Sequence, residues 1–357
     1  MLQPDITVIK NILIRAPNWI GDAALCLPAI EALKAAYPQA EITALARPWV
    51  SPVFLNNPSI KRIIEYDKGG MHRGISGRLK LIQDIKRRGF DMAVLFQNAF
   101  EAALVAFMAG IPVRTGYARD FRGFLLTHPI RVEQNIKKTH QVFYYLKIAA
   151  SLSKNRQSSD VSRQPKIYLT EEEKSRADDF LTKNGMGDGV VVGMAPGASY
   201  GPAKRWMADR FKEAAGRLAD DYGAKLFLFG GKDDREICNN VLDGLNGLNL
   251  AGEIDLRTSI ALLSRCSLFI TNDSGPMHLA ASLGVPTVAV FGSTDPKLTG
   301  PLGDRVRVVK KDIACSPCLE RECKYGHYEC MKMISVDDVY SAAAHLLEEN
   351  KQGVENF

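Results

Sequence analysis

A turn in the second half of the chain carries residue types that suit the binding of a phosphate. It follows a run of apolar and β-branched residues, Leu268 to Thr271, which predicts a buried strand. Pro276 then suits the start of a helix, because its missing N–H would have no partner there, and Gly275 lets a ligand approach the backbone closely. Free N–H groups at such a helix start attract anions. The side chains that could complete the site are those of Asp273, Ser274 and His278.

A glycine-rich loop, Met194 to Trp206, precedes that turn and contains the pair Lys204 and Arg205. Two cations after a loop of small residues suit a pyrophosphate, although a Lys-Arg pair is also common on protein surfaces. We expect Gly197 in this loop to contact the same ligand.

A second glycine turn, Phe229 to Asp234, lies between these two segments. Its paired glycines allow close backbone approach, and its acids could bind ribose hydroxyls. Alternatively, Asp233 or Asp234 only caps the helix that follows.

The loop Arg15 to Asp22 places a carboxylate beside Gly21, at the start of a helix. Asp22 could accept a proton from a substrate hydroxyl as a general base. It could equally serve only as the cap of that helix, and the spacing leaves both readings open. Each loop has an ordinary structural explanation, but all four follow expected strands, and their combination is harder to explain in that way.

Apolar strands alternate with helical segments in both halves of the chain, which predicts two doubly wound α/β domains. The expected strands are Val8 to Ala16, Glu41 to Ala46, Arg62 to Tyr66, Met92 to Gln97, Val190 to Ala195 and Lys225 to Gly230, followed by the strands on either side of the 272–276 turn. The expected helices are Ala23 to Tyr37, Arg78 to Arg88, Glu101 to Ala109, Thr139 to Leu152, Thr170 to Asn184, Asp209 to Tyr222 and Asp234 to Leu245.

A polar segment without periodicity, Ser153 to Pro165, reads as the linker between the two domains. We therefore expect domains at 1–165 and 166–334, and a C-terminal helix and tail at 335–357 that could pack back on the first domain. Ligands of open α/β sheets bind beyond the carboxyl ends of the strands, so the four loops should face a cleft between the domains.

Composition narrows the class of protein. The chain has 357 residues, of which 46% are hydrophobic and 24% charged, and a net charge of +6, as in a globular protein with a mildly basic surface. The basic residues are interspersed with acids rather than gathered in a tail, and we expect no nucleic-acid partner. Neither a signal sequence nor a transmembrane run is recognisable, so a cytoplasmic location is expected.

The absence of G-x-G-x-x-G after the first strand and of G-x-x-x-x-G-K-[ST] argues against a dinucleotide oxidoreductase and a P-loop enzyme.

Four of the seven cysteines lie close together, with the spacing C-x2-C-x4-C-x6-C. They are Cys315, Cys318, Cys323 and Cys330. Such ligands could hold a structural zinc ion, with His327 nearby. The spacing is not that of a standard zinc finger, so reduced packing thiols or a redox-labile loop remain alternatives.

Several long motifs, in this order along the chain, resemble the ADP-heptose:lipopolysaccharide heptosyltransferases. They are NWIGDAALCLPAI, PGASYGPAKRW, FGGKDD and TNDSGPMHLAASLGVPTVAVFGSTDP. The likeness extends over nearly the whole chain. It implies the GT-B fold, which has two Rossmann-like domains, and an inverting transfer of heptose from ADP-L-glycero-β-D-manno-heptose to the lipopolysaccharide inner core. GPAKRW and the tryptophan of NWIGDA favour the branch that adds the second core heptose.

The resemblance also implies roles for particular residues. The catalytic base of the family corresponds to Asp22, and its phosphate-binding lysine to Lys204. Its phosphate-binding turn corresponds to Asp273, Ser274 and Gly275, with His278 on the helix that follows. The ribose-binding acid corresponds to Asp234, and the adenine-packing position to Ile254. No cofactor is required, apart from the possible zinc.

An anionic acceptor, whose sugars carry carboxylates and phosphates, suggests further basic contacts in the first domain. Arg114, Arg119 and Arg122 are the candidates, although surface arginines are common. The enzyme should make peripheral contact with the cytosolic face of the inner membrane, where this acceptor is built. The alternatives are a sister heptosyltransferase that acts at another core position, a non-hydrolysing nucleotide-sugar epimerase of the same fold, and a binding module without turnover.

Overall fold

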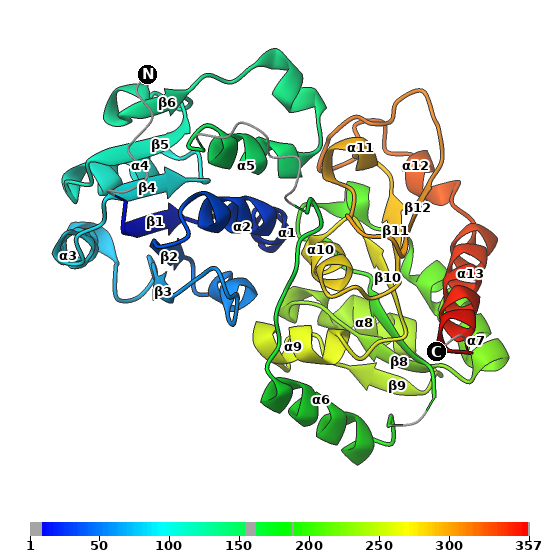
Figure 1. Cartoon of the computed structure of the whole chain (residues 1–357). Coiled ribbons are helices and arrows are strands. Elements are labelled where there is room, and N and C mark those ends of the chain that lie inside the picture. Colours follow the sequence, from blue (N-terminus) through cyan, green and yellow to red (C-terminus); the bar gives the residue numbers. More distant parts are fainter. Residues whose placement is uncertain (1–8, 154–161, 188, 356–357) are drawn as a thin grey trace. The chain divides into compact units, whose positions relative to one another are not determined.

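The computed structural model describes residues 9–153, 162–187 and 189–355. The chain divides into two compact units, Met1–Tyr168 and Leu169–Phe357 (Figure 1). This boundary lies close to the expected linker 153–165, of which residues 154–161 fall outside the described part.

Unit 1 contains a six-stranded parallel sheet with the order β3-β2-β1-β4-β5-β6. The strands are β1 (Asn11–Arg15), β2 (Glu41–Ala46), β3 (Arg62–Glu65), β4 (Met92–Leu95), β5 (Val113–Tyr117) and β6 (His128–Ile130). The helices are α1 (Ile20–Leu25), α2 (Leu27–Ala36), α3 (Gly74–Arg87), α4 (Phe100–Met108) and α5 (Gln141–Ala150), with short 3-10 turns at η1 (Ser51–Phe54), η2 (Gly123–Leu125) and η3 (Gln134–Lys138).

Unit 2 contains a second six-stranded parallel sheet, with the order β12-β11-β10-β7-β8-β9. Its strands are β7 (Val191–Ala195), β8 (Lys225–Leu228), β9 (Gly247–Asn249), β10 (Leu268–Asn272), β11 (Thr287–Phe291) and β12 (Val306–Lys310). Its helices are α6 (Glu171–Lys183), α7 (Ala208–Tyr222), α8 (Arg235–Leu242), α9 (Leu256–Leu263), α10 (Gly275–Ser282), α11 (Pro296–Thr299), α12 (Glu329–Lys332) and α13 (Val336–Glu355), with 3-10 turns η5 (Pro202–Lys204) and η6 (Lys232–Asp234).

Both sheets have the strand order of a dinucleotide-binding fold, read from one edge to the other. In such a sheet the order reverses between the first and fourth strands, which here means between β1 and β4 and between β7 and β10. Ligands bind beyond the carboxyl ends of the strands at this switch point. The expected pair of doubly wound α/β domains is therefore confirmed, and the switch point of each unit marks where its site should lie.

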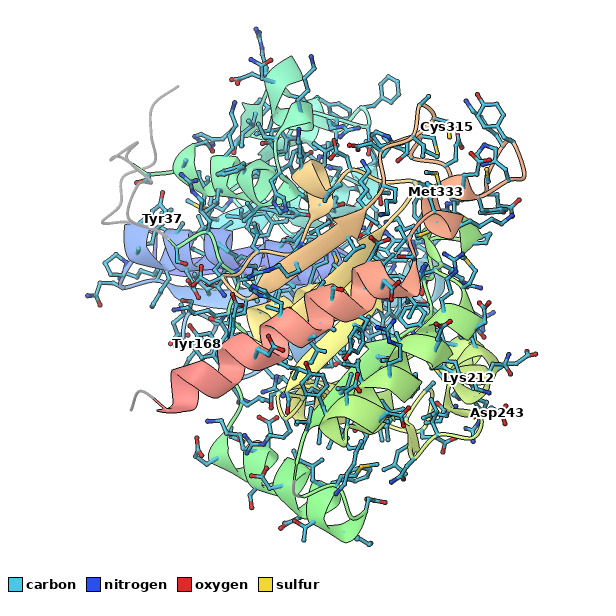
Figure 2. All side chains as sticks on the ribbon, turned by 90° about the vertical axis from the view of Figure 1, so that its right-hand side faces the viewer. Tyr37, Tyr168, Lys212, Asp243, Cys315 and Met333 are labelled. Carbon is cyan, nitrogen blue, oxygen red and sulfur yellow. The ribbon has the colours of Figure 1, made fainter. Side chains whose placement is uncertain are left out.

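Central strands are buried along their whole length, as expected for parallel strands covered on both faces. Successive residues of β11 point to opposite faces: Val288 and Val290 belong to the main core cluster, while Ala289 and Phe291 pack with Met277 of α10. Helix α7 packs against α8 and α13, and α9 packs against α6 and α10. A hydrogen bond of 2.7 Å from Lys212 Nζ to Asp243 Oδ2 also ties α7 to the end of α8 (Figure 2).

The C-terminal helix packs within unit 2. Its apolar face, which includes Val339, Ala343 and Leu346, joins the core cluster that contains Trp206 and Phe211. Figure 1 shows α13 alongside α7. The buried face of this helix therefore completes the core of the second unit.

A capping box starts α6 and also links it to α9. Thr170 Oγ1 accepts a hydrogen bond of 3.2 Å from the Glu173 N–H, and the Glu173 carboxylate accepts one of 2.8 Å from the Thr170 N–H. Arg257 of α9 contacts the same carboxylate at 2.5 Å. Its hydrogen bonds are the main reason why the pKa of Glu173 is lowered to about 2.

The helix predicted at residues 23–37 is in fact two helices. Helix α1 ends at Leu25, Cys26 forms a turn, and α2 begins at Leu27. Pro28 lies in the first turn of α2 and has no N–H to continue the hydrogen bonds of α1. None of the helices in the described part of the chain is both long and apolar enough to cross a membrane.

Candidate active site

The expected donor residues of unit 2 meet at its switch point. Lys204 follows β7, Asp273 follows β10, and β7 and β10 are neighbouring strands. Lys204 Nζ lies 2.5 Å from Asp273 Oδ2, and the two side chains are 13% and 4% exposed. Thr294, after β11, donates a hydrogen bond of 2.6 Å to the same carboxylate oxygen. Lys204 Nζ also lies 4.7 Å from the ring centroid of Tyr200. The Lys204 ammonium is therefore fixed by the Asp273 carboxylate, which Thr294 in turn holds, and by the ring of Tyr200.

Asn272 locks the glycine-rich loop onto β10. Its Nδ2 donates a hydrogen bond of 2.7 Å to the carbonyl of Pro196, and its Oδ1 accepts one of 3.0 Å from the N–H of Trp206. The loop is thus clamped on both sides of Lys204. Arg205, which we paired with Lys204 as a phosphate cation, directs its guanidinium group to the Ala198 carbonyl and so helps to hold the loop.

Helix α10 begins directly after Asp273, with Ser274 as its N-cap. The Ser274 side chain makes no capping hydrogen bond and lies 3.2 Å from Thr271 Oγ1 instead. The first N–H groups of α10 have no carbonyl partner within the helix, as at any helix start, and they favour an anion. His278, expected beside the phosphate, is buried within α10.

The expected ribose acid lies against the same glycine-rich loop. A Cβ atom at Gly197 would stand 2.1 Å from Asp234 Oδ1, so only glycine lets the two loops come this close. Asp234 Oδ2 accepts a hydrogen bond of 3.0 Å from the Gly231 N–H. Asp234 is the N-cap of α8 but makes no side-chain capping bond to that helix. Ile254, the expected adenine contact, is half-buried in the loop between β9 and α9.

Asp22 lies at the switch point of unit 1, in the first turn of α1. The N-cap of α1 is Trp19, which makes no side-chain capping bond, so the reading of Asp22 as the helix cap is wrong. Asp22 Oδ1 accepts a hydrogen bond of 3.0 Å from the hydroxyl of Tyr145 on α5. Burial, together with the charge of Asp22, holds the pKa of Tyr145 well above its usual value, which keeps this hydroxyl a donor. Tyr145 was not expected from the sequence, because no feature of the α5 sequence distinguishes it from the neighbouring aromatic residues.

Glu101 is a second carboxylate near this sheet edge, at the start of α4. Burial alone would raise its pKa, but hydrogen bonds from Tyr66 and Lys68 and the charges of Lys68 and Arg78 lower it. The Tyr66 hydroxyl lies 2.7 Å from Glu101 Oε1, and Lys68 Nζ lies 3.0 Å from Oε2. These partners make Glu101 a poor proton acceptor.

Two of the three candidate acceptor arginines brace the fold of unit 1. Arg122 is completely buried, and its guanidinium group donates to the carbonyls of Tyr117 and Gln97. Arg114 donates from Nε to the carbonyl of Leu125 at 2.7 Å. Of the three, only Arg119 is exposed. The expectation of acceptor contacts from Arg114 and Arg122 is corrected accordingly, because their hydrogen-bond donors are used inside the unit.

Three of the clustered cysteines, Cys315, Cys318 and Cys323, lie in the loop between β12 and α12, where Figure 2 labels Cys315, and Cys330 lies within α12. All four line one small cavity, together with His327. Among the residues that the structure describes, however, no three His, Cys, Asp or Glu side chains are already arranged to hold a metal ion. Backbone N–H groups of residues 325–328, that of Tyr328 first, lower the pKa of Cys323.

Residues 78–329 match the family described as Glycosyltransferase family 9 (heptosyltransferase). The chain belongs to this family.

Relatives of this family 9 chain share most of its length. The lipopolysaccharide heptosyltransferase 2 of Escherichia coli (strain K12) is 34% identical over 309 residues, which covers 84% of this chain and 88% of the relative. The lipooligosaccharide heptosyltransferase 2 of Campylobacter jejuni (strain ATCC 700819) is 29% identical, with 95% and 99% covered. The solved structure of E. coli ADP-heptose LPS heptosyltransferase II matches with a TM-score of 0.82 at 30% identity, over 96% of this chain and 99% of that one. The expected family and the GT-B fold are thereby confirmed, and this family 9 chain is a glycosyltransferase.

Two buried arginines of the family 9 chain were missed by sequence reasoning. Arg15 ends β1, and Arg47 follows β2; they are 3% and 7% exposed. Burial and the neighbouring charge of Arg47 lower the pKa of Arg15 to about 10. Arg47 lies between the rings of Trp49 and Tyr66, at 5.5 and 4.6 Å, and its Nε is buried without a hydrogen-bond partner. Their positions at the ends of apolar strands were the available signal, because such positions face the ligand side of a parallel sheet.

Proposed function

We propose that this family 9 chain transfers L-glycero-D-manno-heptose from ADP-L-glycero-β-D-manno-heptose to the heptose of the lipopolysaccharide inner core, as heptosyltransferase II. The names of the E. coli and C. jejuni relatives support this assignment. The structural observation that carries it is the group formed by Lys204, Asp273 and Thr294 beside the start of α10, at the position where a doubly wound sheet binds a nucleotide.

The donor would bind along the carboxyl edge of unit 2. Its diphosphate would contact Lys204 and the first N–H groups of α10, which Asp273, Ser274 and Gly275 present. Asp234 would accept hydrogen bonds from the ribose hydroxyls, and Gly197 leaves room beside it. Ile254 would pack against the adenine, while His278 supports the helix from within. A cation and backbone N–H groups can offset the charge of a diphosphate, so we propose that transfer requires no cofactor.

The chemical step would be a direct displacement with inversion. The oxygen of the acceptor hydroxyl attacks the anomeric carbon of the donor, and the bond from that carbon to the β-phosphate oxygen breaks. Asp22 takes the proton of the hydroxyl, and the Tyr145 hydroxyl holds its carboxylate in place. The electron pair of the broken bond leaves with ADP, whose new charge is stabilised by Lys204 and α10.

The acceptor would bind the carboxyl edge of unit 1. The exposed rings of Trp19 and Trp49 offer flat surfaces for sugars. The buried Arg15 and Arg47 support these loops from within unit 1, since their guanidinium groups donate to the carbonyls of Leu45 and Tyr66. Trp49 Nε1 donates a hydrogen bond of 3.0 Å to the Asn18 carbonyl, which joins its loop to that of Asp22. Arg119 remains a candidate contact for the carboxylates and phosphates of the acceptor.

We also propose peripheral contact between unit 1 and the membrane surface that carries the acceptor. Met71 and Ile75, at the start of α3, are each 77% exposed, and Leu79 is 42% exposed. Arg73 and Arg78 are exposed beside them. Exposed apolar side chains among basic residues are typical of a surface that binds anionic lipid headgroups.

The test is a transfer assay with the purified chain, ADP-heptose and an acceptor that carries the first core heptose. We expect the acceptor to gain one heptose as one ADP is released, at a rate that is at least about a hundredfold lower for the Asp22→Asn variant. Transfer only to an acceptor without that heptose would assign the chain to another core position. Conversion of a UDP-sugar without an acceptor would indicate an epimerase, and binding of ADP-heptose without turnover would leave a binding module.

A further inference from the structure

The seven cysteines of this chain fall into two groups with different surroundings. Cys26, Cys238 and Cys266 are isolated from one another and buried, and burial raises the pKa of each thiol. They behave as small apolar core residues. The second group, here named the thiol cluster, consists of Cys315, Cys318, Cys323 and Cys330. Its first three members are partly exposed, so apolar packing does not account for them.

The thiol cluster lines a single cavity that also has an imidazole and a cation in its wall. His327 and Lys324 contribute these two groups. Soft thiolate ligands, with or without an imidazole, are what Zn²⁺ and Fe²⁺ select in proteins. The ammonium of Lys324 would offset part of the negative charge that several thiolates bring. Carboxylates, which would favour a harder ion, are not among the side chains lining this cavity.

The segment that carries most of the cluster is irregular. Residues 311–328 form neither helix nor strand, and Leu319 and Tyr325 expose their apolar side chains by 53% and 61%. A long irregular loop in a compact domain is usually either functional or fixed by specific contacts. A bound metal ion would supply such contacts, since four ligands from one segment close it into three short loops.

We propose that the thiol cluster binds one thiophilic transition-metal ion, Zn²⁺ or Fe²⁺. In the described part of the chain, no three of its side chains are arranged around one point. Binding would therefore turn the thiols inward by rotation about χ1, towards the cavity that they already line.

The metal would also brace the loops that bind the donor diphosphate, an effect that rests on the proposed function. The Ala203 N–H, next to Lys204, donates a hydrogen bond of 3.0 Å to the carbonyl of Arg321. The Tyr200 hydroxyl donates one of 2.8 Å to the carbonyl of Leu319. The Leu319 N–H in turn donates one of 2.8 Å to the carbonyl of Ser293, the neighbour of Thr294. Because these hydrogen bonds join residues 315–330 to the loop that carries Lys204, fixing the first segment would also fix the position of Lys204.

The first test is elemental analysis of the full chain, purified without added metal or chelator. We expect about one equivalent of zinc or iron per chain, and the analysis itself distinguishes the two ions. The variants Cys318→Ser and Cys323→Ser should lose the metal, while the control Cys238→Ala should retain it. Because the serine variants could misfold, thiol alkylation of the folded wild-type chain is the second measurement: the cluster should react only after a chelator is added.

A wild-type chain without metal, whose four cluster thiols react freely while it is folded, would overturn the metal site. So would a mass lower by two hydrogens, the sign of a disulfide. The bracing effect predicts that removal of the metal weakens ADP binding by about tenfold, as for other residues that position a site indirectly. Unchanged ADP affinity in the folded, metal-free chain would refute the bracing. A chain that holds its metal but never binds ADP would instead contradict the proposed function.

Discussion

The two units have the same strand order but place opposite charges at corresponding positions. The loop after the first strand ends in the carboxylate of Asp22 in unit 1 and contains the ammonium of Lys204 in unit 2. A proton acceptor suits a hydroxyl nucleophile, and a cation suits a diphosphate leaving group. One topology can therefore serve both halves of a displacement reaction, because only the loop residues at the switch point need to differ.

The two sites also differ in how completely the protein surrounds them. Lys204 is fixed by the Asp273 carboxylate and the Tyr200 ring, and Asn272 clamps the loop that carries it. Unit 1 instead leaves large apolar side chains exposed: of the fifteen such residues in the described structure, eleven lie between Trp19 and Phe124. A small, uniform donor suits a site that is already formed, whereas a large lipid-linked acceptor needs an open surface. Variants in each of the two units test this difference.

The largest effect is expected at Asp22. Asp22→Asn removes the proton acceptor but keeps an oxygen that can accept the Tyr145 hydrogen bond. Turnover should fall by roughly two to four orders of magnitude, the usual contribution of a positioned general base. ADP affinity, measured by calorimetry, should stay unchanged, because the donor residues lie in unit 2.

Thermal unfolding of the Asn variant serves as the control for Asp22. Its midpoint should stay close to that of the wild type, since Asp22 does not cap α1. A variant that unfolds early yet keeps its rate per folded molecule would assign Asp22 a structural role, and the base would have to lie elsewhere.

A smaller effect is expected at Lys204. Lys204→Ala should lower kcat/KM by on the order of a hundredfold, the scale of losing one preorganised electrostatic group. It also leaves the nearly buried Asp273 carboxylate without its cation, which costs stability. Rates must therefore be compared per folded molecule, with Thr294→Val as the control that removes only the hydroxyl bond to Asp273.

An effect below threefold for Lys204→Ala would remove Lys204 from the donor site. An effect no larger than that of Thr294→Val would show that the lysine acts only by holding Asp273. Loss of ADP binding together with turnover is the outcome that the proposed leaving-group role requires.

Sequence reasoning singled out the loops that we propose to bind the donor, because their signals are local. Glycine, proline and a cation following an apolar strand define the 272–276 turn and the Lys204 loop whatever surrounds them. The pairing of Lys204 with Asp273 was not predictable, since it depends on β7 and β10 being neighbours. Which strands are neighbours is set by the strand order of the sheet, and this order cannot be read from a short segment of sequence.

The arginines that were expected to bind the acceptor show what the sequence alone could not reveal. Arg114 and Arg122 lie in a basic segment that looks exposed in the sequence, but their guanidinium groups donate to backbone carbonyls inside unit 1. Arg15 ends β1 and Arg47 follows β2, and neither was singled out from the sequence. Whether an arginine braces the fold or faces a ligand depends on which carbonyls the fold leaves unpaired nearby, and this is a property of tertiary structure.

The smallest effect is expected at the exposed surface of α3. Ile75 and Leu79 are four residues apart and so lie on one face of the helix. The double variant Ile75→Ser and Leu79→Ser should weaken co-sedimentation with vesicles that contain anionic lipid by roughly fivefold to tenfold, because each side chain would bury only part of its apolar area at the interface. Turnover on a detergent-solubilised acceptor should not change. The matched control in unit 2 is Val308→Ser with Met333→Ser, which alters side chains that are 41% and 52% exposed. Equal loss of vesicle binding in both pairs, or no loss in either, would contradict the assignment of the membrane surface to unit 1.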